Sequence, residues 1–198
     1  MRKLFLVVPL SAVVVGGLVG YRLANPRTAS PEFVVSVSGR PAPLFQLYDE
    51  QSQIVRLARY IGRHKLLIVF FDGSRGPDES ALLVNLRQAF LPIRKTKAIV
   101  LAISSLRPSQ LRPPPGERGE RTSRAEPFPF TLLADTLDNP DQPDHAVHRL
   151  YGAFDENNRA PREAVFVVDG AGIIRHAHLG PAELGTPAQW ARELARVR

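Results

Sequence analysis

The stretch Leu67-Ile-Val-Phe-Phe-Asp-Gly-Ser-Arg-Gly-Pro-Asp78 decides the fold predicted for this chain. It opens with an uninterrupted apolar run, which is typical of a buried strand, and continues into a turn that contains Gly and Pro. Apolar residues at helical spacing follow, namely Leu82, Leu83, Leu86 and Phe90. The pattern predicts a core strand that leads through a tight turn into a helix.

Further apolar runs predict an α/β domain around this strand. Leu66–Phe71, Ala98–Ile103 and Ala164–Val168 are continuously apolar, as expected for central strands that helices cover on both faces. We expect a sheet of four or five strands that contains Leu67–Phe71, Ala98–Ile103, Ala164–Val168 and Ile173–His176. The chain has 198 residues, 44% of them hydrophobic, which is enough for one well-buried core.

Five segments, in order along the chain, resemble the peroxiredoxin and thiol-disulfide reductase family (the AhpC/TSA and redoxin group). They are Gly39-Arg-Pro-Ala-Pro-Leu-Phe45, the hairpin-like Leu47–Gly62, Pro127-Phe-Pro-Phe-Thr-Leu-Leu-Ala-Asp135, Val147-His-Arg-Leu-Tyr-Gly-Ala153 and Ala164–Arg175. Each match is weak alone, but the ordered set covers about residues 39–180. The resemblance implies a thioredoxin-like fold with a central mixed sheet flanked by helices.

The resemblance also implies where an active site would lie. Arg75 and Asp78 match the two thiols of a Cys-Gly-Pro-Cys motif, and the peroxiredoxin register places the thiol near Asp78 or Glu79. The arginine that this family carries before its late strand is matched by Glu163, next to Arg162. We therefore predict a degenerate active-site turn, which is a candidate partner-binding face. Its residues are Arg75, Gly76, Pro77, Asp78, Glu79, Arg162 and Glu163.

The absence of cysteine restricts the chemistry at that turn. Without a thiolate the chain itself cannot attack a peroxide or exchange disulfides, so we assign no catalytic residue. The residues also have an ordinary structural interpretation. Acidic side chains at a helix start complement the helix dipole, and Ser74 is a candidate N-cap or a turn residue.

The histidines and acidic residues give weak signals for metal binding. His145 and His148 have a spacing that can present two ligands to a metal, but we expect His148 at the surface. The acidic segment from Asp135 to Asp144 lacks the spacing of an EF-hand. His176 and His178 alternate on a predicted strand, where we expect an exposed rim. We predict no metal and no cofactor.

The first residues form a separate segment. Arg2 and Lys3 precede Leu4–Val19, which is apolar and uncharged. We interpret residues 1–24 as a membrane anchor, with a cleaved secretory signal as the alternative, and residues 25–38 as a linker to a domain over 39–198. Both interpretations export the domain to the extracytoplasmic side, the periplasm or a lumen.

Charge and composition limit the partners. The net charge is +7 and the sequence pI is about 10.3, but no stripe of basic residues with aromatic platforms indicates nucleic-acid binding. Residues 104–129 are rich in Pro and Arg, and we expect an irregular basic loop there. The predicted partners are a membrane protein or membrane complex, with an anionic lipid surface as a further possibility.

Two functions follow from the sequence. In the first, the chain is a non-catalytic, membrane-anchored, exported thioredoxin-fold module that binds a protein partner, as an accessory or assembly subunit of a membrane complex. In the second, it is a peroxiredoxin-like antioxidant or oxidoreductase that works without its own cysteines. The cysteine count favours the first.

Overall fold

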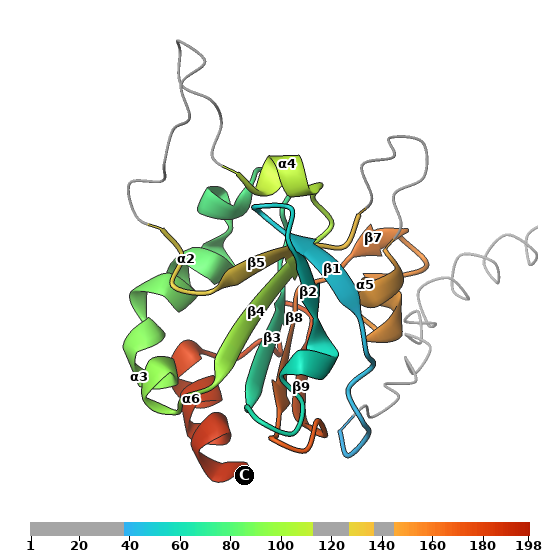
Figure 1. Cartoon of the computed structure of the whole chain (residues 1–198). Coiled ribbons are helices and arrows are strands. Elements are labelled where there is room, and N and C mark those ends of the chain that lie inside the picture. Colours follow the sequence, from blue (N-terminus) through green and yellow to red (C-terminus); the bar gives the residue numbers. More distant parts are fainter. Residues whose placement is uncertain (1–37, 113–126, 137–144) are drawn as a thin grey trace, which may run out of the picture. The chain divides into compact units, whose positions relative to one another are not determined.

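The computed structural model describes residues 38–112, 127–136 and 145–198 (Figure 1). The chain divides into two compact units, Met1–Val35 and Ser36–Arg198, and the described residues belong to the second. The predicted anchor (1–24) and nearly all of the predicted linker (25–38) lie outside the described residues. No helix in the described ranges is long and apolar enough to cross a membrane.

A seven-stranded mixed sheet forms the centre of the domain. In spatial order its strands are β2 (Ile54–Arg56), β1 (Gln46–Asp49), β5 (Thr131–Ala134), β4 (Ile99–Ser104), β3 (Leu66–Phe70), β8 (Ala164–Val168) and β9 (Ile174–Leu179). β3, β4 and β5 are parallel, whereas β8, β9, β1 and β2 each pair antiparallel with their neighbours. The prediction of four or five strands was too low, because the early hairpin and β5 join the same sheet.

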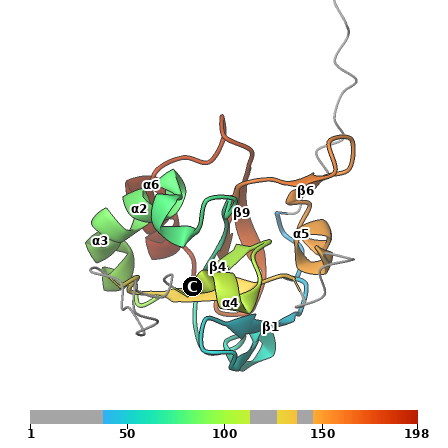
Figure 2. The ribbon, with the colours of Figure 1, turned by 90° about the horizontal axis from the view of Figure 1, so that it is seen from above.

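Helices cover both faces of the sheet. The helical elements are η1 (Leu57–Arg59), η2 (Pro77–Glu79), α2 (Ala81–Gln88), α3 (Phe90–Lys95), α4 (Pro108–Leu111), α5 (Ala146–Leu150) and α6 (Pro187–Arg196). Figure 2 shows α2, α3 and α6 on one side of the sheet and α5 on the other. A small separate sheet pairs β6 (Phe154–Asp155) with β7 (Ala160–Pro161).

Side chains of β3 divide between two hydrophobic clusters. Leu67 and Val69 point toward α2, α3 and α6, while Ile68 and Phe70 point toward α5, because successive strand residues face opposite sides. All five residues of β3 are buried. In β8, Val165, Phe166 and Val167 are fully buried, as the apolar run predicted.

The helix predicted after the turn is divided in two. α2 ends at Gln88 and α3 begins at Phe90. Pro92 explains the break, because in a continuous helix its ring would clash with the carbonyl of Gln88. Restarting the helix at Phe90 places Pro92 in a first turn, where proline is tolerated.

The region predicted as an irregular loop, residues 104–129, is partly regular. Ser104 is the last residue of β4, and α4 follows within the described part. At the start of α4 the Arg107 backbone N–H donates to Gln110 Oε1 at 3.0 Å. Residues 113–126 of the predicted loop are outside the described ranges.

We expect a chain that lacks residues 1–30 to fold on its own, because both hydrophobic clusters of the described residues are built from Ala42 onward. Far-UV circular dichroism and a thermal melt would measure this. The expected result is a soluble protein with a single cooperative transition. Aggregation with a broad, non-cooperative melt would contradict the prediction.

Candidate functional site

The turn between β3 and α2 has a geometry that requires its glycines. A Cβ at Gly73 would lie 2.6 Å from Leu106 Cγ, so the turn packs closely against the segment that follows β4. Gly76 has φ 94° and ψ 163°, a region essentially limited to glycine. Pro77 then begins the short helix η2. The Gly-Pro pair thus shapes the turn as the sequence predicted.

Of the two roles predicted for Ser74, N-cap and turn residue, the structure shows the second. Its N–H and its hydroxyl both donate to the Asp72 carboxylate, at 2.9 and 3.1 Å. Ser80 caps α2, and its Oγ accepts the Leu83 backbone N–H at 3.4 Å. Because η2 lies between Ser74 and α2, Ser74 is too far from the start of α2 to cap it.

A small cavity of about 140 Å³ opens at this turn. Its lining residues are Asp72, Ser74, Arg75, Gly76, Glu79, Ser80, Ala81 and Glu163. We call it the acidic cavity, because it gathers three carboxylates and one guanidinium. Residues far apart in sequence meet here because Phe70 at the end of β3 pairs with Ala164, directly after Glu163.

Glu163 is the most perturbed group of the acidic cavity. Burial raises the pKa of the Glu163 carboxyl, and the nearby charge of Asp72 raises it further. A hydrogen bond from the Asp72 backbone N–H opposes these effects without cancelling them. The surroundings of Glu163 therefore disfavour its ionised form.

Arg75 and Glu79 pair loosely at the rim. Arg75 Nε lies 3.8 Å from Glu79 Oε2, and both side chains are mostly exposed. Such a surface pair contributes little to stability. Asp78 lies in η2 but does not line the acidic cavity. In the described ranges, no three acidic or histidine side chains come close enough together to hold a metal ion.

Arg162 does not join the cavity. Its guanidinium pairs with Asp155 at 2.9 Å, on the small sheet of β6 and β7. Hydrogen bonds from Asn158 and Arg162 hold the pKa of Asp155 below its usual value. Of the two candidates beside β8, only Glu163 reaches the turn, because adjacent residues of an extended segment point in opposite directions.

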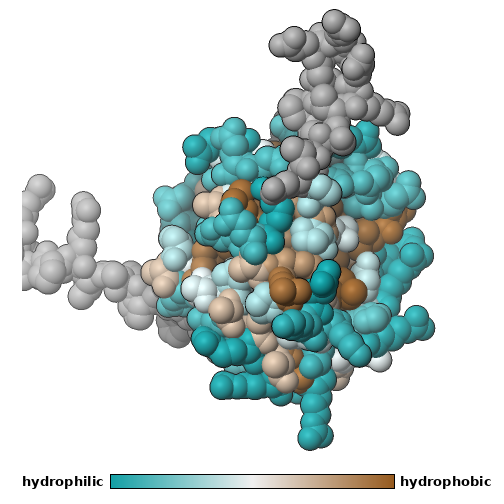
Figure 3. All heavy atoms as spheres, turned by 90° about the vertical axis from the view of Figure 1, so that its left-hand side faces the viewer, coloured by the Kyte–Doolittle hydropathy of each residue, from teal (hydrophilic) through white to brown (hydrophobic). Residues whose placement is uncertain are grey.

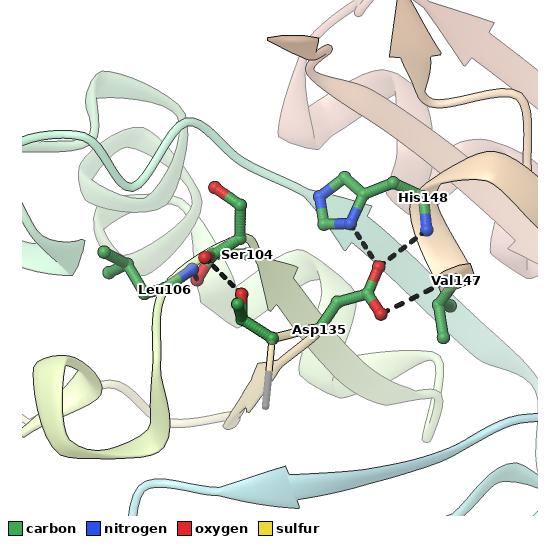
Figure 4. A network of polar contacts seen from close by, with 7 residues as sticks. Ser104, Leu106, Asp135, Val147 and His148 are labelled. Carbon is green, nitrogen blue, oxygen red and sulfur yellow. Dashed lines mark hydrogen bonds and ion pairs between the residues drawn. The ribbon is translucent and has the colours of Figure 1, made fainter. Parts of the chain in front are cut away.

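Behind the end of β3 lies a buried network that the sequence did not reveal (Figure 4). The Asp135 carboxylate accepts the backbone N–H groups of Val147 and His148, at 3.2 and 2.8 Å. It also contacts His148 Nδ1 at 2.5 Å. We call this network the carboxylate clamp. It fixes the start of α5 to the end of β5, and the His148 ring packs edge-on to Phe70 at 4.9 Å between centroids.

The carboxylate clamp corrects one prediction, because His148 is fully buried rather than at the surface. Asp135, the first residue of the acidic segment, is also buried and is a structural acceptor. The rest of that segment, residues 137–144, lies outside the described ranges. No local signal marked this contact, because its partners are separated by thirteen positions and only the fold brings them together.

The strand histidines are also less exposed than predicted. His178 Nε2 contacts Glu193 Oε2 of α6 at 2.9 Å, with both side chains mostly buried. Burial alone would raise the pKa of Glu193, but hydrogen bonds from His178 and Gln189 outweigh it and lower that pKa. This pair attaches α6 to the edge strand β9.

Comparison with known proteins identifies the family. The family model described as "AhpC/TSA family" matches residues 38–177. Alkyl hydroperoxide reductase E of Mycobacterium bovis and of Mycobacterium tuberculosis are each 33% identical over 160 residues, covering 80% of this chain and 96% of the relative. The fold is that of a thioredoxin-like redoxin. The chain belongs to the AhpC/TSA family.

Solved structures of low identity share the fold. The reduced 2-Cys peroxiredoxin of Plasmodium vivax has a TM-score of 0.61 at 17% identity, covering 80% of this chain and 94% of that one. Peroxidoxin BcpB of Mycobacterium tuberculosis gives 0.58 at 15% identity, with 80% and 93% covered. A DsbE-type thiol:disulfide interchange protein of Chlorobium tepidum gives 0.52 at 19%, with 80% and 97% covered.

Removing the carboxylate clamp should destabilise the domain strongly. Asp135→Ala leaves buried N–H donors without their acceptor, and we expect a loss of about 3 kcal/mol in the free energy of unfolding. Urea denaturation would measure it. The matched control is Asp49→Ala, which removes an acceptor of two backbone N–H groups in an exposed turn. Its loss should be severalfold smaller, and equal losses would refute the structural role.

The turn should accept a dithiol. Arg75→Cys with Asp78→Cys places two thiols around the retained Gly76-Pro77 pair, where the following helical turn favours a thiolate. We expect a folded protein with a reversible intramolecular disulfide, measured by mass spectrometry across a glutathione redox titration. If the thiols cannot be oxidised without unfolding, the match of this turn to a Cys-Gly-Pro-Cys site is wrong.

Proposed function

We propose that this chain is a non-catalytic member of its family that binds a protein partner through the acidic cavity. The proposal rests on one observation: the turn keeps its Gly-Pro pair, but carboxylates stand where the family has its reactive thiol and its arginine. The Gly-Pro turn persists, while Glu79 occupies one position matched to the thiol and Glu163 the position matched to the family arginine.

These residues do not supply the chemistry of a thiol peroxidase. Peroxide reduction in this family begins with a thiolate that attacks an oxygen, and the chain has no cysteine. A second carboxylate in place of the arginine would also repel, rather than stabilise, an anionic nucleophile. The alternative, an oxidoreductase that works without its own cysteines, rests on the relatives named alkyl hydroperoxide reductase.

The charge of the acidic cavity indicates the chemistry of the partner. Asp72, Glu79 and Glu163 outnumber Arg75, and the volume suits one side chain rather than a folded surface. A lysine or arginine of the partner would pair with Glu163, which is already partly desolvated. Such a contact would offset the unfavourable burial of the Glu163 charge.

The proposal includes the cellular setting. The apolar segment Leu4–Val19, preceded by Arg2 and Lys3, supports a membrane anchor with the domain on the extracytoplasmic side. The partner is then a membrane protein or membrane complex, for which this chain is an accessory or assembly subunit.

Glu163→Gln should stabilise the domain and weaken partner binding. Because the folded-state pKa of Glu163 is raised, its ionisation costs stability, and the cost grows as pH rises from the ordinary glutamate pKa through the folded value. At neutral pH the variant should melt about 1–3 °C higher than the parent. Well below the ordinary glutamate pKa the two should melt together. Glu156→Gln, at an exposed residue, is the matched control and should not raise the melting temperature.

Crosslinking pull-down from solubilised membranes tests the binding. The parent chain should recover one stoichiometric membrane complex, Glu163→Gln should recover less of it, and Glu156→Gln should recover as much as the parent. A peroxidase assay with a thiol reductant discriminates the alternative function. Turnover above the buffer blank would overturn the non-catalytic proposal.

A further inference from the structure

The end of the domain opposite the acidic cavity is formed by the start of β3 and the ends of α3 and α6 (lower end of Figure 1). Lys65 directly precedes β3, and its Nζ donates to the Leu194 carbonyl oxygen of α6 at 3.1 Å. The carboxyl end of the same strand leads into the turn at Gly73. One buried strand therefore separates the two ends.

Cations gather at this end without acidic partners. We call them the basic pole: Arg63, Lys65, Arg94, Lys95, Arg192 and Arg196. Within the ranges that the structure describes, none of them is in an ion pair. The single acidic residue of α3 and α6 is Glu193, which is buried and bonded to His178 and Gln189.

An apolar groove lies between these cations. It has a volume of about 620 Å³ and runs between α3 and α6, with Ala188, Ala191 and Ala195 along one wall. Lys65, Lys95 and Arg192 also line it. Figure 3 shows this side of the domain, with apolar residues in tan and brown between hydrophilic ones in teal. The surface thus combines the exposed methyl groups of Ala188 and Ala195 with positive charge that is in no ion pair.

The helix dipoles explain only part of this charge. Arg94, Lys95 and Arg196 lie in the last turns of their helices, where a cation is favoured. Arg192 is in the middle of α6 and Arg63 precedes β3, so neither complements a helix end. Both side chains are exposed and can therefore contact an external anion.

The chain enters the domain at the same end. Gly39 N–H donates to Ile174 O at 2.7 Å, and Ala42 N–H donates to Gly172 O at 2.8 Å. The adjacent Gly170 N–H donates to the carbonyl oxygen of Arg198, just after α6, at 2.8 Å. The first described residues of the chain therefore lie at the same end of the domain as the basic pole.

We propose that the basic pole docks on an anionic phospholipid surface. The inference rests on the proposed function in one respect, because an anchor before residue 25 would hold this end near the bilayer. Docking aligns the domain so that the acidic cavity faces away from the lipid and toward the partner. The cations come from three separate elements at one end, which suits a planar array of phosphates more than a single peptide.

The test uses the full chain, in which the lack of cysteine allows one labelled position at a time. Ala195→Cys places a fluorophore at the basic pole. Ala182→Cys places it in the turn after Gly180, whose N–H donates to the Glu163 carbonyl oxygen at 2.9 Å. Quenching by headgroup-labelled lipid is compared between vesicles of phosphatidylcholine and vesicles with about 30 mol% phosphatidylglycerol.

We expect quenching at Ala195→Cys to be severalfold stronger than at Ala182→Cys, only with phosphatidylglycerol and only at low salt. Adding Lys95→Glu with Arg192→Glu should abolish the difference. The matched reversal Arg56→Glu with Arg159→Glu, at exposed cations outside the basic pole, should leave it intact. Equal quenching at the two labels, or no effect of the first reversal, would overturn the proposal. The proposal would also be overturned if polyglutamate bound at the basic pole and anionic vesicles did not.

Flotation of the chain with lipid vesicles distinguishes binding through the predicted anchor from binding through the basic pole. If the chain fails to float with neutral vesicles, the anchor is wrong, and the basic pole must then account for all binding to anionic vesicles. In that case Lys95→Glu with Arg192→Glu should weaken the partition by at least about tenfold. Flotation with neutral vesicles that is unaffected by salt, together with equal quenching at both labels, would support the anchor and refute the pole.

Discussion

Strand β3 has no exposed face and no free edge, and the rest of the domain depends on this constraint. Its residues Leu66–Phe70 are fully buried, with β4 parallel on one side and β8 antiparallel on the other. Hydrogen bonding continues to Phe71, whose N–H donates to Ile103 O at 3.0 Å. The position of the turn after β3 is therefore fixed by the sheet. Because Phe70 pairs with Ala164, Glu163 lies beside this turn.

The fold was predictable because its strongest signals are local. Uninterrupted apolar runs located β3, β4 and β8, and the Gly76-Pro77 pair located the turn. The break between α2 and α3 at Pro92 was also readable in principle. The proximity of Glu163 to the turn followed from the family resemblance and not from spacing, since nothing local connects the two. The clamp between Asp135 and His148 was not predictable, because tertiary structure alone makes those groups neighbours.

The acidic cavity and the basic pole lie at opposite ends of the domain because the topology places helix starts at one end and helix C-termini at the other. The parallel strands β3 and β4 end near the start of α2, where backbone N–H groups favour negative charge. A thiolate would be stabilised there, and carboxylates occupy the place in this chain. The opposite end collects helix C-termini, where cations are favoured. The same backbone dipoles thus permit both the acidic cavity and the basic pole, although a net charge of +7 would not suggest an acidic site.

The strand order has a consequence for how the molecule acquires its structure. β3 is among the first strands synthesised, yet its neighbour β8 is close to the carboxyl end of the chain. Until Ala164–Val168 is available, one edge of a wholly apolar strand stays open, which favours association with other chains. The centre of the sheet can close only after the chain has been synthesised past residue 168.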